Sequence, residues 1–345
     1  MIQAKPEVSA IVTNYNGWQM GLLEDFFRKF LKNDFKDFEI FLVDNASLDE
    51  SVKEVKKNFG NDKRLKIIQN PINLMSSGIN MALEKAQGKY ILFLNNDIYL
   101  AKGALKKMLE YLKKNPGVAA VQGKILSFYD RRIIDDVGET IDIYGNPQTL
   151  GHQEKDIGQY EKITDILSAT GAACLMKASV LDKVGLLDPV YGIGYEDMDL
   201  SLRIRLAGYS IRYLPGALVY HKRGASVSQS LEKIKSQIKF DFNKNRLSTI
   251  IKNYQLKTLL KTLPMVLILY IGAAFLEIFY KQLWGFGLSR VQAIKWVIKN
   301  LPYLLKKRRE VQKLRKLDDE TALFPFMTKN RILHALFVFI HSKKW

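Results

Sequence analysis

The chain has 345 residues, which exceeds one average domain, and its net charge of +18 is confined to the last third. Residues 1–220 carry equal numbers of acidic and basic side chains, whereas residues 221–345 carry 25 basic and 7 acidic ones. Cys174 is the only cysteine, which excludes an intramolecular disulfide and favours a small core residue over a catalytic thiol. The start, MIQAKPEVSA, lacks the pattern of a secretory signal, so we expect this part of the chain to stay in the cytosol.

The first hundred residues alternate short apolar runs with helical patterns. This alternation predicts an α/β fold, with a mixed, mostly parallel sheet and helices on both faces. Polar residues follow the strands, and open α/β sheets bind their ligands at this edge. Strands are expected at 8–16, 38–44, 65–69 and 90–94, and helices at 16–33, after Ser47, and at 79–88.

The middle of the chain is less regular. A helix is expected near 102–114 and a strand near 118–122. The polar stretch 127–165 follows, and we expect it to cover the side on which an acceptor binds. We predict one domain over 1–235 and a basic, apolar helical region over 236–345.

The last third combines long apolar runs with basic side chains. Residues 262–276 are uncharged but shorter than the roughly 18–20 residues that span a bilayer, so a span at 262–280 stays open. The segments 291–309 and 331–345 are amphipathic. We predict that 240–345 lies on an anionic membrane surface, with a helical subdomain packed on the catalytic part as the alternative. No RNA-binding signature occurs, and no nucleic-acid partner is expected.

A carboxylate follows the strand at 90–94, in the run Asn95–Asn96–Asp97. A divalent cation held there would bridge two phosphates and offset the charge that grows on a departing diphosphate. The simpler interpretation is a turn, because Asn and Asp are common after strands. His221 follows a later strand and is structural or, beside a carboxylate-bound metal, a ligand.

Three carboxylates lie within four residues of GYEDMDLSLR, at Glu196, Asp197 and Asp199. Acidic residues at a helix N-terminus can simply cap it or compensate its dipole. A positioned carboxylate can also take the proton from an attacking hydroxyl, which is worth roughly 10²–10⁴ in rate. The segment alone leaves both interpretations open.

Two further segments have ligand-binding features. Asn73, Gly78 and Asn80 surround an expected helix start, where glycine permits close backbone approach and the N-terminus favours anions. Asp44 and Asn45 follow a strand and are suited to accept hydrogen bonds from a base or ribose. Ordinary turn chemistry explains both segments equally well.

The order of six segments resembles the family 2 glycosyltransferases, most closely their bacterial and archaeal rhamnosyltransferase-like branch. The resemblance covers residues 7 to about 228. The segments are VSAIVTNYN, FLVDNASLDES, NPINLMSSGINMALEKAQGKYILFLNNDI, ATGAACLMKASVLDKVGLLD, GYEDMDLSLRIRLAGY and VYHKRGAS.

The resemblance implies a GT-A fold and an inverting, metal-dependent transfer from a nucleotide diphosphate sugar. Manganese or magnesium would be the metal, UDP or dTDP would carry the sugar, and rhamnose is one candidate. The acceptor would be a saccharide or lipid-linked molecule in cell-surface glycan synthesis at the cytoplasmic face of the membrane. The Gln-x-x-Arg-Trp motif of processive synthases is absent after Asp197, so transfer of a single sugar is expected.

The resemblance also assigns roles to residues. Asp197 would be the base, and Glu196 would orient it or the acceptor. Asp97 and His221 would hold the metal, because the first position of the Asp-x-Asp motif is Asn95 here. Gly171 and Ala172 would lie near the donor sugar and acceptor. The donor pocket would contain Thr13, Tyr15, Asn16, Asp44, Asn45, Asn73, Asn80, Asn95 and Asn96.

Three other functions were weighed against this one. A sugar nucleotidyltransferase needs a Gly-rich, Arg-containing loop after the first strand, and TNYNGW has no Arg. A dehydrogenase is disfavoured because no G-x-G-x-x-G follows a strand. A non-catalytic carbohydrate- or membrane-binding scaffold stays open because Asn95 departs from the motif.

Overall fold

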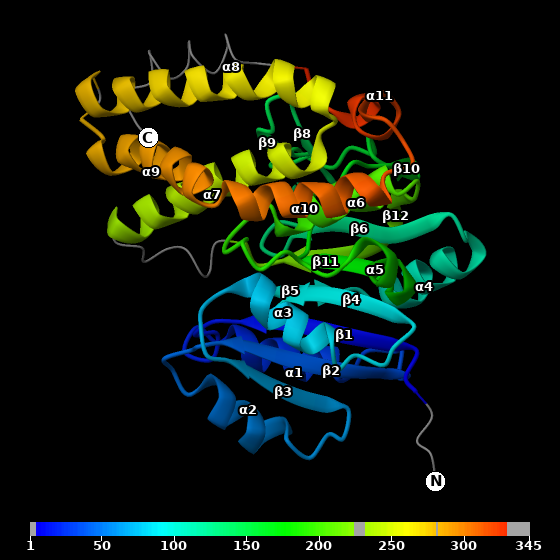
Figure 1. Ribbon diagram of the computed structural model, residues 1–345. Helices are drawn as coiled ribbons and strands as arrows, with labels where there is room; N and C mark the ends of the chain where they lie inside the picture. Colours follow the sequence, from blue (N-terminus) through cyan, green and yellow to red (C-terminus); the bar gives the residue numbers. More distant parts are fainter. Residues whose placement is uncertain (1–4, 224–231, 281, 330–345) are drawn as a thin grey trace.

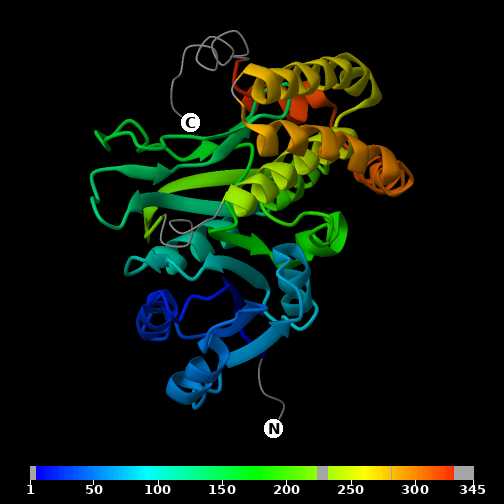
Figure 2. The ribbon, with the colours of Figure 1, turned by 90° about the vertical axis from the view of Figure 1, so that its left-hand side faces the viewer.

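The computed structural model describes residues 5–223, 232–280 and 282–329. A central sheet carries helices on both faces, and long helices of the C-terminal third stack beside it (Figures 1 and 2). The predicted helix at 331–345 lies outside the described residues.

The sheet has the order β10-β12-β6-β11-β4-β1-β2-β3, with β5 paired to β12 and β7 to β6. β1 to β4 run parallel, and β11 runs antiparallel between β4 and β6. This mixed sheet confirms the predicted fold class. The strands are β1 (Val8–Asn14), β2 (Phe38–Asn45), β3 (Leu65–Asn70), β4 (Tyr90–Asn95), β5 (Ile98–Leu100), β6 (Val118–Ser127), β7 (Ile134–Asp136), β10 (Thr164–Asp165), β11 (Ala173–Lys177) and β12 (Ser210–His221), and a separate hairpin joins β8 (Glu139–Ile141) and β9 (Pro147–Thr149).

Alternating side chains of β1 explain why helices cover both faces of the sheet. Val8, Ala10 and Val12 share one core with α1 and α4, whereas Ile11 shares a second core with α3, α5 and α6. These helices are α1 (Leu22–Phe30), α2 (Ser51–Phe59), α3 (Met75–Leu83), α4 (Ala104–Lys114), α5 (Ala178–Val184) and α6 (Glu196–Leu206).

Three predicted helix ends differ from the structure. α1 begins only at Leu22, because Gly21 precedes it with a positive φ of 67°. α2 begins at Ser51 rather than after Ser47, whose hydroxyl instead donates to Asp44. α3 ends at Leu83, before Gly88, where the backbone passes so close to Ser9 that a Cβ would meet its nitrogen at 2.4 Å.

The C-terminal helices share a core with the part of the chain that carries the sheet. Leu202 and Leu206 of α6 pack with Leu247, Tyr270 and Leu304 in one buried cluster. Residues on both sides of position 235 therefore belong to a common hydrophobic core. The helices are α7 (Glu232–Asn253), α8 (Leu256–Phe275), η1 (Leu276–Tyr280), α9 (Trp284–Lys299), α10 (Leu301–Leu314), α11 (Asp319–Ala322) and η2 (Phe324–Phe326).

Leu256–Tyr280 is, among the described residues, the segment that is long and apolar enough to cross a membrane. It contains the predicted span at 262–280. One third of its most apolar window is buried against the rest of the protein. Length and composition alone do not distinguish a span from a packed surface helix.

Candidate active site

Asn14 links the polar ends of three neighbouring strands. Its Nδ2 donates to Asp44 Oδ1 at 2.8 Å, and its Oδ1 accepts from Asn96 Nδ2 at 2.7 Å. All three side chains are buried, and the parallel register sets Asn14 opposite Asp44. Sequence reasoning missed Asn14 as a site residue, although it lies in the recognised TNYN run. Its two hydrogen bonds fix the floor of the edge at which open α/β sheets bind ligands.

The residues around Asn14 divide into exposed and structural positions. The Thr13 hydroxyl donates to Asn95 Oδ1 at 3.4 Å, and the Tyr15 ring is 42% exposed beside them. Asn16 has a positive φ of 53°, and its Oδ1 accepts from the Leu48 backbone at 2.7 Å. Asn16 therefore holds the loop after β2, while Tyr15 is free to contact a ligand.

The other predicted donor residues lie in different surroundings. Asn45 Oδ1 accepts from Asn70 at 2.9 Å, and a Cβ on Gly78 would meet this oxygen at 2.3 Å, so α3 approaches β2 closely. Asn73 is exposed in the loop before α3. Asn80 points away from this edge, because its amide pairs with the Leu187 backbone at 2.7 and 3.1 Å. Asn45 therefore lies with Asn14 and Asp44 at the ends of the strands, whereas Asn80 connects α3 to the loop that contains Leu187.

Asp97 and His221 come together, as predicted, because β5 pairs with the end of β12. His221 Nε2 lies 3.3 Å from Asp97 Oδ1, and His221 Nδ1 lies 2.7 Å from Asp135 Oδ2. Arg223 donates to both oxygens of Asp135, at 2.6 and 3.2 Å. Sequence reasoning missed Asp135, which orients the imidazole from the far side of the ring.

This pair fits a divalent cation. Asp97 Oδ1 is buried and has no hydrogen-bond partner, although the His221 ring lies beside it. Burial lowers the pKa of His221, but its hydrogen bond with Asp135 and the nearby carboxylate of Asp97 outweigh this and raise the pKa to about 9. The carboxylates of Asp97 and Asp135, on either side of the His221 ring, thus favour positive charge at this position, either a proton on the ring or a metal ion beside it. The described residues contain no cluster of three side-chain ligands, so the remaining ligands would come from elsewhere.

Glu196 and Asp197 begin α6, where Tyr195 precedes them with a positive φ of 71°. Asp197 Oδ2 accepts from the Gly171 backbone at 3.0 Å, whereas Glu196 Oε2 is buried without a partner. Both residues are only partly buried. Burial, and the charge of Asp197, raise the pKa of Glu196 to about 8, and burial raises the pKa of Asp197.

Two hydrogen bonds connect the end of β4 to the start of α6 through Gly171 and Ala172. The Asn95 backbone donates to Ala172 O at 3.1 Å, and the adjacent Gly171 backbone donates to Asp197. β4 and β11 are antiparallel neighbours, so the end of β4 lies beside the start of β11. Gly171 and Ala172 therefore join Asn95–Asp97 and Asp197 at one edge of the sheet.

Two additional carboxylates face this edge and were not predicted. Asp136 accepts from Gln122 and from the Gly138 backbone, each at 2.7 Å, and burial raises its pKa to about 6. Burial, and then the charges of Asp197 and Asp136, raise the pKa of Glu139 well above its usual value. No motif in the polar stretch 127–165 marked either residue.

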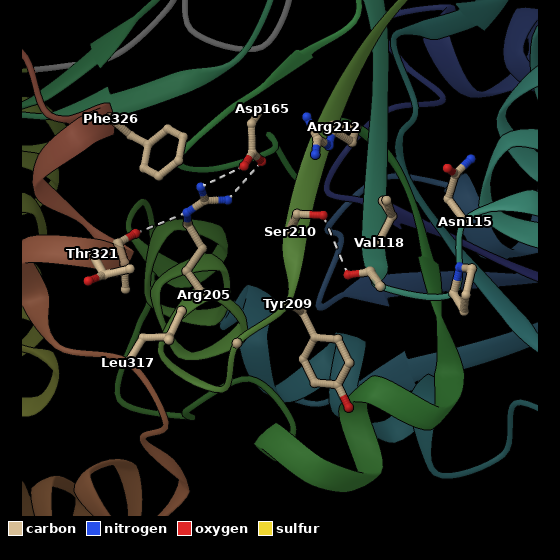
Figure 3. A pocket seen from close by; sticks show the side chains of 14 residues that line it. Asn115, Val118, Asp165, Arg205, Tyr209, Ser210, Arg212, Leu317, Thr321 and Phe326 are labelled. Atoms are coloured by element: carbon tan, nitrogen blue, oxygen red, sulfur yellow. Dashed lines mark hydrogen bonds and ion pairs between the residues drawn. The ribbon is translucent and has the colours of Figure 1, made fainter.

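A separate pocket of about 410 Å³ lies at the opposite edge, where β6 and β12 begin (Figure 3). Arg205 crosses it, donating to Asp165 at 3.0 and 3.1 Å and to Ala322 O at 3.1 Å. None of the predicted site residues lines this pocket. Its contacts join α11 to the sheet.

Solved structures share this architecture. A mannosyltransferase from Pyrobaculum calidifontis, in complex with GDP-Man and Mn2+, superposes with a TM-score of 0.51 at 15% sequence identity. The superposition covers 90% of this chain and 86% of that one. The fold is therefore the predicted GT-A fold.

The sequence comparisons identify the family. The profile of Glycosyl transferase family 2 matches residues 9–185, so the chain belongs to the family 2 glycosyltransferases. The O-antigen chain rhamnosyltransferase WbaN of Salmonella anatum is 27% identical over 66% of this chain and 70% of its own length. A GalNAc(5)-diNAcBac-PP-undecaprenol beta-1,3-glucosyltransferase of Campylobacter jejuni is 33% identical over 35% of this chain and 38% of its own. The matches cover 22%, 44% and 38% of the first three curated relatives.

Proposed function

We propose that the protein transfers one sugar from a nucleotide diphosphate donor to a hydroxyl acceptor with inversion at the anomeric carbon. The observation that carries this proposal is the hydrogen-bonded connection between the end of β4 and the start of α6. Through it, Asp97 and Asp197 are held at one edge of the sheet. A sugar ring between them would have its diphosphate leaving group toward Asp97 and the acceptor hydroxyl toward Asp197.

The donor nucleotide would lie over the ends of β1 and β2. Asp44 is fixed there by Asn14, and the Tyr15 ring beside it is exposed. Thr13, Asn95 and Asn96 would complete the pocket toward the diphosphate. A divalent metal, manganese or magnesium, would be held by Asp97 and His221, and when bound it supplies positive charge to the leaving diphosphate.

Asp197 would act as the base. The acceptor oxygen forms a bond to the anomeric carbon as the bond from that carbon to the diphosphate oxygen breaks, and the acceptor proton passes to Asp197. Near neutral pH Glu196, with a pKa of about 8, keeps its proton. A carboxylate with a raised pKa is the stronger base.

The names of two relatives indicate a class of sugar donor and a class of acceptor for the proposal. WbaN is named a rhamnosyltransferase and the Campylobacter enzyme is named for an undecaprenol-linked saccharide. We propose a UDP- or dTDP-sugar donor, with rhamnose as one candidate, and a saccharide or lipid-linked acceptor in cell-surface glycan synthesis. The basic C-terminal third would keep the protein at the cytoplasmic face of the membrane.

Asp197→Asn tests this proposal. The variant should lose transfer while binding the donor as the wild type does, because the amide cannot take the proton but keeps the side-chain shape. Transfer is measured with nucleotide sugars and manganese, and donor binding by calorimetry. Full transfer by the variant would refute the assignment of the base.

The alternative, a non-catalytic carbohydrate- or membrane-binding scaffold, is tested separately. A scaffold would release no nucleoside diphosphate from any nucleotide sugar, with either manganese or magnesium. Release of nucleoside diphosphate by the wild type at a higher rate than by the Asp197→Asn variant supports an enzymatic function.

A further inference from the structure

α8 has one face packed on the protein and one face open to solvent. Val266, Tyr270 and Ala274 are buried, and the Tyr270 hydroxyl donates to Asn243 O of α7 at 3.2 Å. The opposite face, continued into η1, carries Ile268, Ile271, Phe275 and Phe279, each at least 60% exposed. Helical spacing lines these four side chains up as a stripe. α8 is also the outermost helix of the stack, with α7, α9 and α10 between it and the sheet (Figures 1 and 2).

The end of this stripe is aromatic. Phe275 and Phe279 lie with ring centroids 4.9 Å apart, and Trp284 at the start of α9 lies 6.2 Å from Phe279. All three rings are more than half exposed. Aromatic rings of this kind are enriched where hydrocarbon meets lipid head groups. An exposed aliphatic and aromatic patch on a charged molecule marks an interaction surface.

Basic side chains border the stripe. Lys257 and Lys261 are exposed at the beginning of α8, and Lys295 and Lys299 are exposed on α9. Residues 262–276 between them carry no charge. An anionic bilayer would accept the apolar stripe and attract the flanking lysines, of which Lys257 also pairs with Glu320.

The chain after α8 returns to the same body that precedes it. Arg308 of α10 donates to the carbonyls of Ile251 and Tyr254, each at 2.6 Å, and the Tyr303 hydroxyl donates to Asp188 at 2.5 Å. Arg290 of α9 also holds Glu277 at 2.8 and 2.9 Å. A bilayer crossed by α8 would place α10 on the other side from Asp188 and α7, and would break the hydrogen bonds of Arg308 and Tyr303.

We infer that the α8–α9 hairpin lies in the plane of an anionic membrane surface, with Ile268, Ile271, Phe275, Phe279 and Trp284 inserted and α8 not crossing the bilayer. This inference rests on the membrane association in the proposed function and gives it a defined surface and geometry. The hairpin binds one leaflet only, so both of its ends stay on the catalytic side.

Vesicle flotation tests the surface. Full-length protein should float with vesicles of equal parts phosphatidylglycerol and phosphatidylcholine. The double variant Ile271→Glu with Phe275→Glu should bind at least about tenfold more weakly, because two inserted side chains become charged. The matched control is Ile157→Glu with Ile163→Glu, at exposed apolar positions away from the C-terminal helices. Equal flotation of both double variants would overturn the inference.

Cysteine labelling tests the geometry. Burial raises the pKa of the Cys174 thiol to about 12, so the native cysteine should not react. Lys257→Cys and Gln282→Cys place single thiols at the two ends of the α8–η1 segment. In inside-out membrane vesicles, a membrane-impermeant maleimide should label both at similar rates. Labelling of Gln282→Cys only after detergent is added would show a span and overturn the inference.

A second copy of this chain is the competing occupant of the stripe. In that case the protein would be a concentration-dependent dimer by light scattering without lipid, and Phe275→Glu would make it a monomer without changing flotation. That result would overturn the inference. Donor hydrolysis in solution is measured on the same samples, so failure of membrane binding and failure of the proposed catalysis are distinguished.

Discussion

Lys252 Nζ of α7 lies 3.0 Å from Asp199 Oδ1, two residues after the proposed base, and 2.6 Å from Asp188 Oδ2. All three side chains are buried, and Asn253 and Tyr191 also donate to Asp199. Together with the Arg203 guanidinium, Lys252 holds the pKa of Asp199 at about 2, against the opposing effect of burial. The helix that carries Asp197 is therefore anchored by a cation from the C-terminal third.

We predict that Lys252→Met destabilises the protein by about 3–5 kcal/mol, because it leaves buried carboxylates without their cation. Chemical denaturation measures the loss. The control is Lys257→Met, which removes an exposed ion pair with Glu320 and should leave the unfolding midpoint unchanged. A loss below about 1 kcal/mol for Lys252→Met would contradict the anchoring role.

Glu196→Gln should gain stability relative to the wild type as pH rises. Burial, then the charge of Asp197, raise the pKa of Glu196 from 4.5 to about 8, so between these values the folded protein holds a proton that the unfolded chain has released. Folding of the wild type therefore weakens with rising pH across this window and levels off above it. Thermal unfolding of both proteins between about pH 5 and 8 measures the difference.

The control for this experiment is Glu110→Gln, at an exposed position on α4. A difference between Glu196→Gln and wild type that stays constant over the same pH range would show that Glu196 is ionised in the folded protein.

Asp135→Asn should weaken manganese binding by about 10–100-fold without removing a ligand, because Asp135 orients His221 and increases its basicity. Manganese titration followed by electron paramagnetic resonance measures the affinity directly. Asp130→Asn is the comparison, since Asp130 pairs with Arg132 at the surface. A manganese affinity equal to that of the wild type in Asp135→Asn would show that Asp135 does not support the metal site.

Asn14→Ala should weaken donor binding and lower stability by about 1–3 kcal/mol, because Asp44 and Asn96 each lose a buried hydrogen bond. Calorimetry with a nucleotide diphosphate and chemical denaturation measure the two effects. Asn58→Ala, on the exposed side of α2, should change neither. Wild-type donor affinity in Asn14→Ala would mean that the site floor does not shape the donor pocket.

The sheet and its polar edge were predictable because buried strands are continuous apolar runs and each ends at a polar residue. Asp97 and His221 could be paired only through the family resemblance, since 124 positions separate their numbers and β5 and β12 bring them together. Asp135 could not be found, because it approaches His221 from 86 residues away in a stretch without periodicity. The contact of Asn80 with the Leu187 backbone was also not predictable, because it depends on how the loop after α5 packs.

The boundary at 235 illustrates a different limit. The change in composition there is real, but charge and hydropathy do not report which helices share a core. α7 and α10 bury Leu247 and Leu304 against Leu202 of α6, contacts that no local pattern predicts. A truncation near 240, which the composition suggests as a test of membrane binding, would instead open this core.

The shared core has an evolutionary consequence. A lipid-binding helix attached by a linker can be exchanged between enzymes as a cassette, leaving the chemistry intact. Here Lys252 and Leu247 come from the helix that leads into α8, and they also support the helix that begins with Glu196 and Asp197. A relative that acquired a different C-terminal third would therefore also have to replace the buried contacts that hold Glu196 and the proposed base Asp197.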